Sequence, residues 1–492
     1  FKAMGLQPGN PDGTYVQAVP LAGITGTPQG HFTVGKKRIA MDMPNNAVAV
    51  TSHFEPSVSV KDSDIVFVGY GVQAPEYGWD DYAGLDVKGK TLVMLVNDPG
   101  FARGTDDIFK GKAMTYYGRW TYKFEEAARQ GATGAIIVHE TEPASYPWEV
   151  VRNSWSGAQA DLVRANGGED RTTFESWITV DVARKLFAEA GLNYDDLKAA
   201  AKEPGFEPVD MGDLTVSGTI VQTVDTMDSR NVVGMLPGTE RPEEYMLYTA
   251  HWDHLGKKTE ERSGAPNQDF YQDDIFNGAV DNATGSAALL EIAEAMAAEE
   301  HPRSGLFLSV TLEESGLLGS AYYADNPTVP LNQIVAGINM DGMLPVGPTN
   351  EMVVVGYGAS ELEDILESKL DAMDRVVKPD PRPEAGSFYR SDHISFAKKG
   401  VPMLYADGGI DKREGGEAAG RAAADAYTAQ RYHKPMDEYS DDWDLSGMVE
   451  DVTALYQVGL EIINSDEWPT WYEGNEFEAA RQQSLADAES GE

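Results

Sequence analysis

Two adjacent acidic residues, Glu313 and Glu314 in the segment TLEESGLLGS, directly follow an apolar run from Leu306 to Leu312. Such a run predicts a buried strand, which would carry both carboxylates to one strand end. One carboxylate can then bind a metal ion while its neighbour acts as a general base. Adjacent glutamates are also common on exposed helices, but the preceding strand favours a hydrolytic metal site here.

Four further residues of ligand type stand at the ends of apolar stretches or in glycine-rich turns. They are His251 in YTAHWDHLG, Asp281 in GAVDNATG, Asp341 in GINMDGM and His433 in RYHKPMDEY. Imidazole and carboxylate donors without sulfur favour Zn²⁺, and Mn²⁺ or Co²⁺ less strongly. With Glu313 and Glu314, these residues predict a two-metal hydrolase centre with five ligands and one base.

The residue types suggest individual roles at this centre. Asp281 has a short side chain in a glycine-flanked turn, so it can face both ions and is the predicted bridge. Asp253 lies two residues after His251 and is expected to accept the second imidazole N–H, which would orient the ring. Glu313 is the predicted base, taking a proton from a water between the ions and passing it to a leaving amine. Singly, each residue has a simpler explanation, such as a surface histidine or a helix N-terminal acid; the combination does not.

Composition limits the possible partners and compartments. The formal net charge of -41 argues against binding to nucleic acid or to an anionic membrane surface. The chain has no cysteine, which excludes disulfides, thiolate ligands and cysteine nucleophiles. It has no run of 18 apolar residues that would span a membrane. The first residue is Phe1, so we expect a secreted or periplasmic protein from which a signal peptide has been removed.

Apolar and helical patterns alternate from about residue 216 onward. The predicted helices cover residues 284–298 and 445–463, and the predicted strands cover residues 231–236, 245–250, 306–312, 334–339, 352–355 and 402–405. This alternation predicts an α/β fold with a mostly parallel central sheet and helices on both faces. Ligands of such sheets bind beyond the carboxyl ends of the strands. The metal centre is therefore expected at that edge. The acidic tail after Asp466 is expected to form a strap across the core that is followed by a frayed end.

The region from about residue 50 to 210 has a separate character. It contains short apolar runs at residues 64–70, 91–96 and 135–138, and a helical pattern that ends at Gly131. No cluster of histidines and carboxylates converges in this region. We therefore predict a non-catalytic module.

The second half of the chain contains, in this order, the segments AHWDHLG, VDNATGS, EESGLLGS, NMDG, SDHISFAKKGVP and YHKPMDEY. These segments resemble the motifs of zinc metallopeptidase family twenty-eight, which includes bacterial leucyl aminopeptidases, glutamate carboxypeptidase and glutaminyl cyclases. The resemblance implies that Glu313 is the base. It implies one zinc ion on His251, Asp281 and Asp341, and a second on Asp281, Glu314 and His433.

The earlier segments VGYGV, KGKTLVMLV and AARQGATGAIIVHE are similar to a protease-associated domain. That resemblance implies a β-rich α+β domain inserted near the start of the peptidase. The implied organisation is residues 1–50 as the N-terminal part of the peptidase domain, 51–210 as the insert and 211–492 as the di-zinc peptidase domain.

We expect an aminopeptidase that acts on peptides, because an acidic surround favours a substrate ammonium group. Three alternatives are a carboxypeptidase or dipeptidase, a glutaminyl cyclase, which uses one zinc, and a receptor-like module that has lost its metals. A carboxypeptidase needs a basic group for the free carboxylate, and Arg390 and Arg431 are candidates. His393, Asp392 and Arg390 are expected to line the substrate pocket, and the polar loop 257–277 is expected to shape it. The sequence leaves the oligomeric state open.

Overall fold

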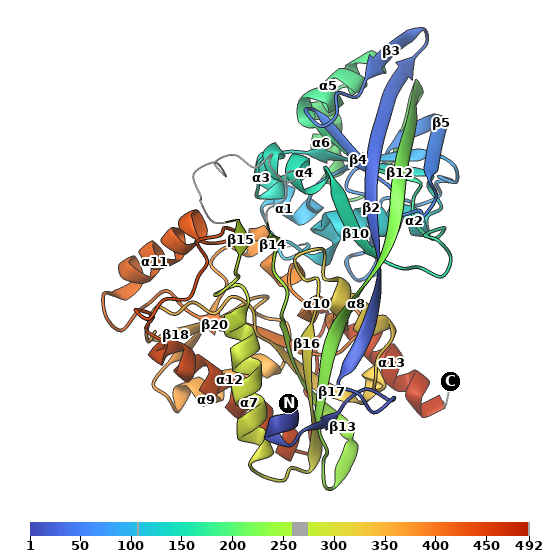
Figure 1. Ribbon diagram of the computed structural model, residues 1–492. Coiled ribbons are helices and arrows are strands. Elements are labelled where there is room, and N and C mark those ends of the chain that lie inside the picture. Colours follow the sequence, from blue (N-terminus) through green and yellow to red (C-terminus); the bar gives the residue numbers. More distant parts are fainter. Residues whose placement is uncertain (106–107, 258–273, 491–492) are drawn as a thin grey trace. The chain divides into compact units, whose positions relative to one another are not determined.

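The computed structural model describes residues 1–105, 108–257 and 274–490 (Figure 1). The chain forms two compact units. The first comprises Phe1–Val19, Asp228–Pro381 and Arg390–Glu492, and the second comprises Pro20–Met227 and Arg382–Tyr389. Each unit combines a sheet with helices that pack against it.

These limits differ from the boundaries at residues 50 and 210 that the sequence suggested. The strand β2 (Val16–Val34) pairs with β3 (Lys37–Ala40) and with β10 (Ala158–Leu162). The strand β12 (Val209–Leu236) pairs along its first part with β5 (Ser57–Phe67). This hydrogen bonding holds residues 20–50 and 211–227 in the second unit.

The sheet of the first unit is mostly parallel, as predicted. The pairs β18–β19, β17–β20, β13–β17 and β13–β16 are parallel, whereas β18–β20 and β12–β16 are antiparallel. The strand order is β19 (Val376–Pro379), β18 (Glu351–Val354), β20 (Met403–Gly408), β17 (Ile334–Asn339), β13 (Arg241–His251), β16 (Arg303–Val310) and the end of β12. The short strand β1 (Gln7–Pro8) pairs with β12.

Helices flank this sheet. Alternate residues of β13, Met246, Tyr248 and Ala250, are buried in one cluster with Leu289 and Leu455, because successive side chains of a strand point to opposite faces. The helices of this cluster are α7 (Ala283–Ala297), α9 (Leu362–Asp371) and α12 (Ser446–Asn464). The helices α8 (Leu318–Asp325) and α10 (His393–Ala397) pack on each other, and α10 also contacts β17 and β20. The helices predicted at residues 284–298 and 445–463 are confirmed by α7 and α12.

The tail after Asp466 packs against the rest of the first unit, which confirms the predicted strap, whereas the segment expected to fray is helical. The helix α13 covers Glu478–Ser490. Trp471 is buried and donates its indole N–H to the carbonyl of Gly400 over 2.9 Å. Arg481 donates to the carbonyl of Ile334 over 2.9 Å. These long-range bonds anchor the start of the helix.

In the second unit, β5, β8, β9 and β11 run parallel, and β4 and β12 flank them in antiparallel orientation. The strands not yet placed are β4 (Ala47–Val50), β8 (Thr91–Leu95), β9 (Gly134–His139) and β11 (Phe174–Thr179), and the longest helices are α2 (Trp120–Arg129), α5 (Val180–Glu189) and α6 (Tyr194–Ala201). The predicted apolar strands and the helix before Gly131 are confirmed. The identity of this unit as a protease-associated domain stays a prediction.

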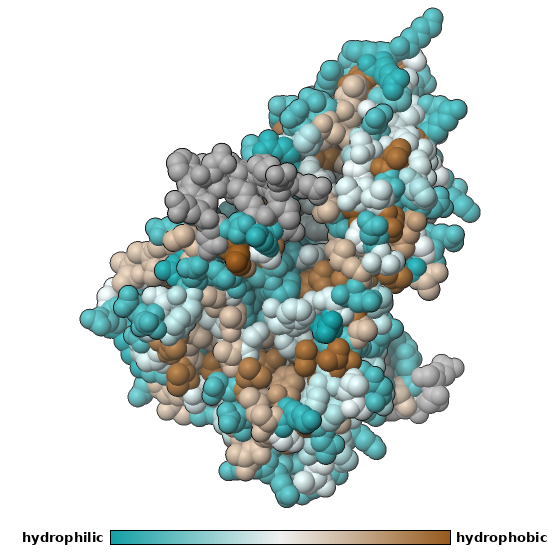
Figure 2. Space-filling model, viewed as in Figure 1, coloured by the Kyte–Doolittle hydropathy of each residue, from teal (hydrophilic) through white to brown (hydrophobic). Residues whose placement is uncertain are grey.

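The surface shown in Figure 2 is mostly hydrophilic, in keeping with the 80 acidic residues of the chain. In the described ranges, we find no helix whose length and apolar character would allow it to cross a membrane.

A buried ion pair in the first unit yields a stability prediction. Arg375 is fully buried, and its Nη2 atom lies 2.5 Å from the Oδ1 atom of Asp451 on α12. Removing that carboxylate leaves a buried charge without its counter-ion, which typically costs about 3–5 kcal/mol. Asp451→Ala is therefore expected to lower the free energy of unfolding by about that amount in denaturant titrations. The matched control is Glu450→Ala, because its partner Arg413 is 41% exposed and such pairs contribute about 0–1 kcal/mol. Equal, small effects of the two variants would contradict this prediction.

Candidate metal centre

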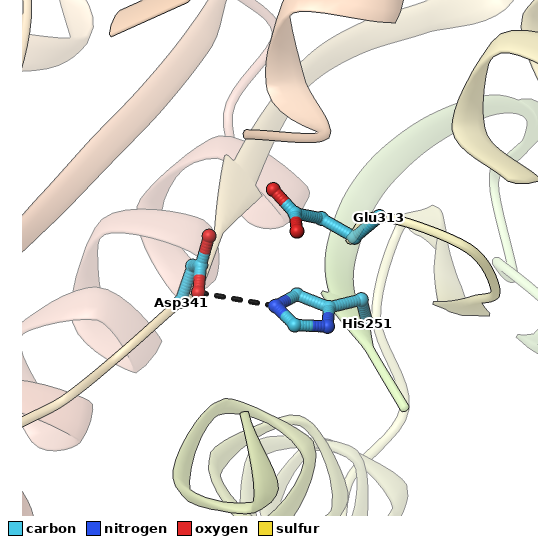
Figure 3. Close-up of side chains that lie close together, drawn as sticks. All are labelled: His251, Glu313 and Asp341. Atoms are coloured by element: carbon cyan, nitrogen blue, oxygen red, sulfur yellow. Dashed lines mark hydrogen bonds and ion pairs between the residues drawn. The ribbon is translucent and has the colours of Figure 1, made fainter. Parts of the chain in front are cut away.

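Three of the predicted residues meet where parallel strands end. The register pairs His251 with Val310 and Thr249 with Asn339, so β13, β16 and β17 finish at the same edge. His251 is the last residue of β13, while Glu313 and Asp341 follow β16 and β17 within three residues. Figure 3 shows their side chains pointing toward one another. One nitrogen or oxygen atom from each lies within 4.8 Å of the others, and Nε2 of His251 is 3.2 Å from Oδ1 of Asp341.

Asp281 joins this group to the remaining predicted ligands. Its Oδ1 atom lies 3.3 Å from Nε2 of His251, and its Oδ2 atom lies 3.3 Å from Nε2 of His433. The same nitrogen of His433 is 3.2 Å from Oε2 of Glu314. Each oxygen of Asp281 therefore faces a different histidine, which is the arrangement a bridging carboxylate requires.

The donor distances fit zinc. Tetrahedral Zn²⁺ binds nitrogen and oxygen at about 2.0–2.1 Å, so two ligand atoms on one ion are separated by roughly 3.3 Å. The four donor pairs described above are separated by 3.2–3.3 Å. The donors divide into a set around His251 and a set around His433, with Asp281 in both. Two imidazoles and three carboxylates, without sulfur, are the ligand chemistry that zinc accepts.

The negative charges of the cluster also favour a bound cation. Burial alone would lower the pKa of His251, but Asp253, Asp281 and Asp341 around it hold that pKa well above its usual value. Burial would raise the pKa of Asp281, yet His251 and His433 depress it. The cluster thus stabilises cationic partners beside its carboxylates. His433 is 38% exposed, whereas the side chains of Asp281 and Glu314 are at most 8% exposed, so the site is open to solvent on the His433 side.

Glu313 has the environment expected of a general base with a shifted pKa. Burial, followed by the charge of Asp341, raises the pKa of Glu313 well above its usual value. Glu313 takes part in neither of the ion pairs that join Asp281 to His251 and to His433. Glu313 therefore lies beside the donor pairs, and its role as the base stays a prediction.

Asp253 contributes differently from the prediction. The Nδ1 atom of His251 is 3.1 Å from the backbone carbonyl of Asp253 and 3.6 Å from its carboxylate, and the longer distance is not a hydrogen bond. The carboxylate instead accepts the backbone N–H of Glu313 over 3.1 Å and that of Glu314 over 3.4 Å. Asp253 thus orients the imidazole through its main chain and fixes the two-glutamate turn through its side chain.

Two residues that sequence reasoning missed hold the ligands in place. Asp437 is fully buried, and its carboxylate accepts the backbone N–H of Val280 and of Asp281, each over 3.1 Å. These two hydrogen bonds connect the loop after His433 to the turn that contains Asp281. Ser391 donates its hydroxyl to Oδ2 of Asp341 over 2.6 Å. The only sequence signal for Asp437 was its place in the segment YHKPMDEY.

The residues predicted to line the substrate pocket lie in different environments. Asp392 and His393 are fully buried, and burial raises the pKa of Asp392 to about 7. The His393 ring lies 5.1 Å from the ring of Tyr405, whose hydroxyl donates to the backbone carbonyl of Asp341. Arg390 is exposed. Their roles in substrate binding stay predictions, and most of the loop 257–277 falls outside the described residues.

The first unit is therefore an α/β unit that carries a cluster of imidazoles and carboxylates at the carboxyl ends of its strands. Residues 231–457 match the model of peptidase family M28. The segment spans His251, Asp281, Glu314, Asp341 and His433.

Individual relatives are distant. A stretch of 147 residues is 29% identical to the mouse protein named Aminopeptidase NAALADL1, covering 28% of this chain and 17% of the mouse protein. The rat protein of that name is 28% identical over 149 residues, with the same coverage. The chain thus matches less than a fifth of the length of these relatives.

Among solved structures, an aminopeptidase from Aneurinibacillus sp. strain AM-1 aligns over 95% of this chain and 87% of its own, with 18% identity and a TM-score of 0.46. A zinc aminopeptidase from Bacillus subtilis aligns over 96% and 90%, with 15% identity and a TM-score of 0.39.

Proposed function

We propose that the chain is a zinc-dependent aminopeptidase that uses two ions. The observation that carries the proposal is the position of Asp281, whose two carboxylate oxygens each lie 3.3 Å from a different histidine. The match of residues 231–457 to the model of peptidase family M28 supports the reaction class, peptide hydrolysis with zinc. The donor distances support two ions rather than one.

Each residue of the site would have a separate role in the reaction. Bound zinc ions would supply the positive charge that polarises a scissile carbonyl and lowers the pKa of water. His251 and Asp341 would hold one ion, Glu314 and His433 the other, and Asp281 both. Glu313 would accept the proton of the attacking water and deliver it to the leaving amine.

The charge of the site favours a peptide with a free N-terminus. Asp281, Glu313, Glu314 and Asp341 bring four carboxylates to one cluster, and two divalent ions offset their charge. A substrate ammonium is compatible with this surround, whereas a terminal carboxylate needs a basic partner. Convergence of all five ligands favours this function over a glutaminyl cyclase with one zinc and over a module without metals.

One observation keeps a carboxypeptidase as the second candidate. Arg390 directly precedes Ser391, whose hydroxyl donates to Oδ2 of the predicted ligand Asp341. Arg390 is therefore adjacent in the chain to a residue that contacts the metal centre. An exposed guanidinium there can bind the free carboxylate of a substrate.

Peptides blocked at one end distinguish these two candidates. The wild-type protein is incubated with zinc and three forms of the same peptide, which are free at both ends, N-acetylated or C-amidated. Mass spectrometry then identifies which end shortens. The proposal expects the free and amidated peptides to lose N-terminal residues and the acetylated peptide to stay intact. Shortening of the acetylated peptide from its C-terminus would favour the carboxypeptidase.

A further inference from the structure

His254, the second histidine of the segment AHWDHLG, is packed against the metal centre without being one of the predicted ligands. Its side chain is 6% exposed, and its Nδ1 atom lies 2.5 Å from Oε1 of Glu314. The other oxygen of Glu314, Oε2, lies 3.2 Å from Nε2 of His433. The two oxygens of Glu314 therefore have different partners.

The distances separate a hydrogen bond from a pair of ligands. Two atoms bound to one zinc ion are about 3.3 Å apart, and the contact between Glu314 and His433 has that length. The contact between Glu314 and His254 is 2.5 Å, which is too short for two ligands and is the range of a short charge-assisted hydrogen bond. Although His254, Asp281 and Glu314 each offer an atom within 4.8 Å of the others, His254 is better explained as a hydrogen-bond donor.

The ring of His254 has little freedom to turn away from Glu314. Gly278 packs against it so closely that a Cβ atom at position 278 would lie 2.7 Å from Cγ of His254. On another side, the ring meets the ring of His433 edge-on, with 5.8 Å between their centroids. This packing fixes the direction of the Nδ1 atom.

We propose that His254 is a positioning residue for the second zinc site. Its Nδ1–H donates to Oε1 of Glu314, which leaves Oε2 as the oxygen directed at the ion held with His433. The proposal rests on the two-zinc function proposed above. His254 would thus orient Glu314 much as the carbonyl of Asp253 orients His251 by accepting its Nδ1–H. Outer partners of this kind typically change metal affinity about 10–100-fold.

The test measures zinc affinity rather than activity. Wild type, His254→Ala and His254→Asn are stripped of metal and titrated with zinc against a chromophoric chelator. Asparagine can place an N–H near the position of Nδ1 but is a poor zinc ligand. We expect His254→Ala to bind one of the two ions about 10–100-fold more weakly and His254→Asn to recover most of that loss. The absorption spectrum of the Co²⁺-loaded Asn variant should match that of the wild type, because the ligands themselves are unchanged.

Each other outcome contradicts a specific statement. Unchanged affinity for both ions in His254→Ala would overturn the positioning role. If His254→Asn does not recover the lost zinc affinity and its Co²⁺ spectrum differs from that of the wild type, His254 is itself a ligand. That result would also overturn the positioning role. A wild-type protein that binds fewer than two ions would overturn the proposed function itself, so the two failures are distinguishable.

Discussion

The Glu313→Gln variant is expected to lose about 10²–10⁴-fold in kcat while keeping both zinc ions. Glutamine has nearly the same shape as glutamate, but its amide cannot take a proton from water. The variant removes the proton acceptor and leaves untouched the donors on His251, Asp281 and His433. Steady-state kinetics and the zinc content of the purified variant check the two halves of this prediction.

A matched substitution controls for nonspecific effects. Glu299 is an exposed glutamate in the same unit, and Glu299→Gln changes charge and shape in the same way away from the site. It is expected to keep wild-type kcat and zinc content. Near-normal turnover of Glu313→Gln with both ions present would show that another group accepts the proton.

Removing the metals is expected to abolish hydrolysis, and adding zinc back is expected to restore it. Without cations, the carboxylates of Asp281, Glu314 and Asp341 are held close together, and their mutual repulsion opposes the folded arrangement. Zinc should therefore also stabilise the fold, by about 2.7 kcal/mol for a site filled at 100 times its Kd. Activity and melting temperature, measured after chelation and after zinc addition, check this prediction.

The shared ligand provides the control for that experiment. In Asp281→Ala, zinc should restore neither activity nor melting temperature, because both sites lose a ligand together. Full activity in a sample shown to be free of metal would refute the proposed chemistry. Recovery of the Asp281→Ala variant with zinc would refute the bridge.

The sequence predicted the sheet of the first unit well because its signals are local. Continuous apolar runs of four to eight residues mark strands that are buried on both faces, and β16 and β17 were recognisable on that basis. Parallel strands then bring their carboxyl ends to one edge, so Glu313 and Asp341 had to lie near His251. That inference needed only the strand ends and no knowledge of the distances.

The features that could not be predicted depend on pairing between distant segments. Residues 20–50 lie in the second unit because β2 and β12 are long strands with partners far along the chain. Residues 382–389 join the same unit, where the N–H of Met114 donates to the carbonyl of Pro383. No local pattern reveals such bonds. For the same reason, the carboxylate of Asp437 and the imidazole of His254 did not stand out, although both lie within four residues of a predicted ligand.

The central claim is that His251, Asp281, Glu314, Asp341 and His433 bind a pair of zinc ions. Crystals of the zinc-loaded protein, measured on either side of the zinc absorption edge, locate each ion directly by its anomalous scattering. We predict two peaks about 3.5–4 Å apart, one beside His251 and one beside His433, with Asp281 between them. A single peak, no peak, or ions bound elsewhere in the molecule would contradict the claim.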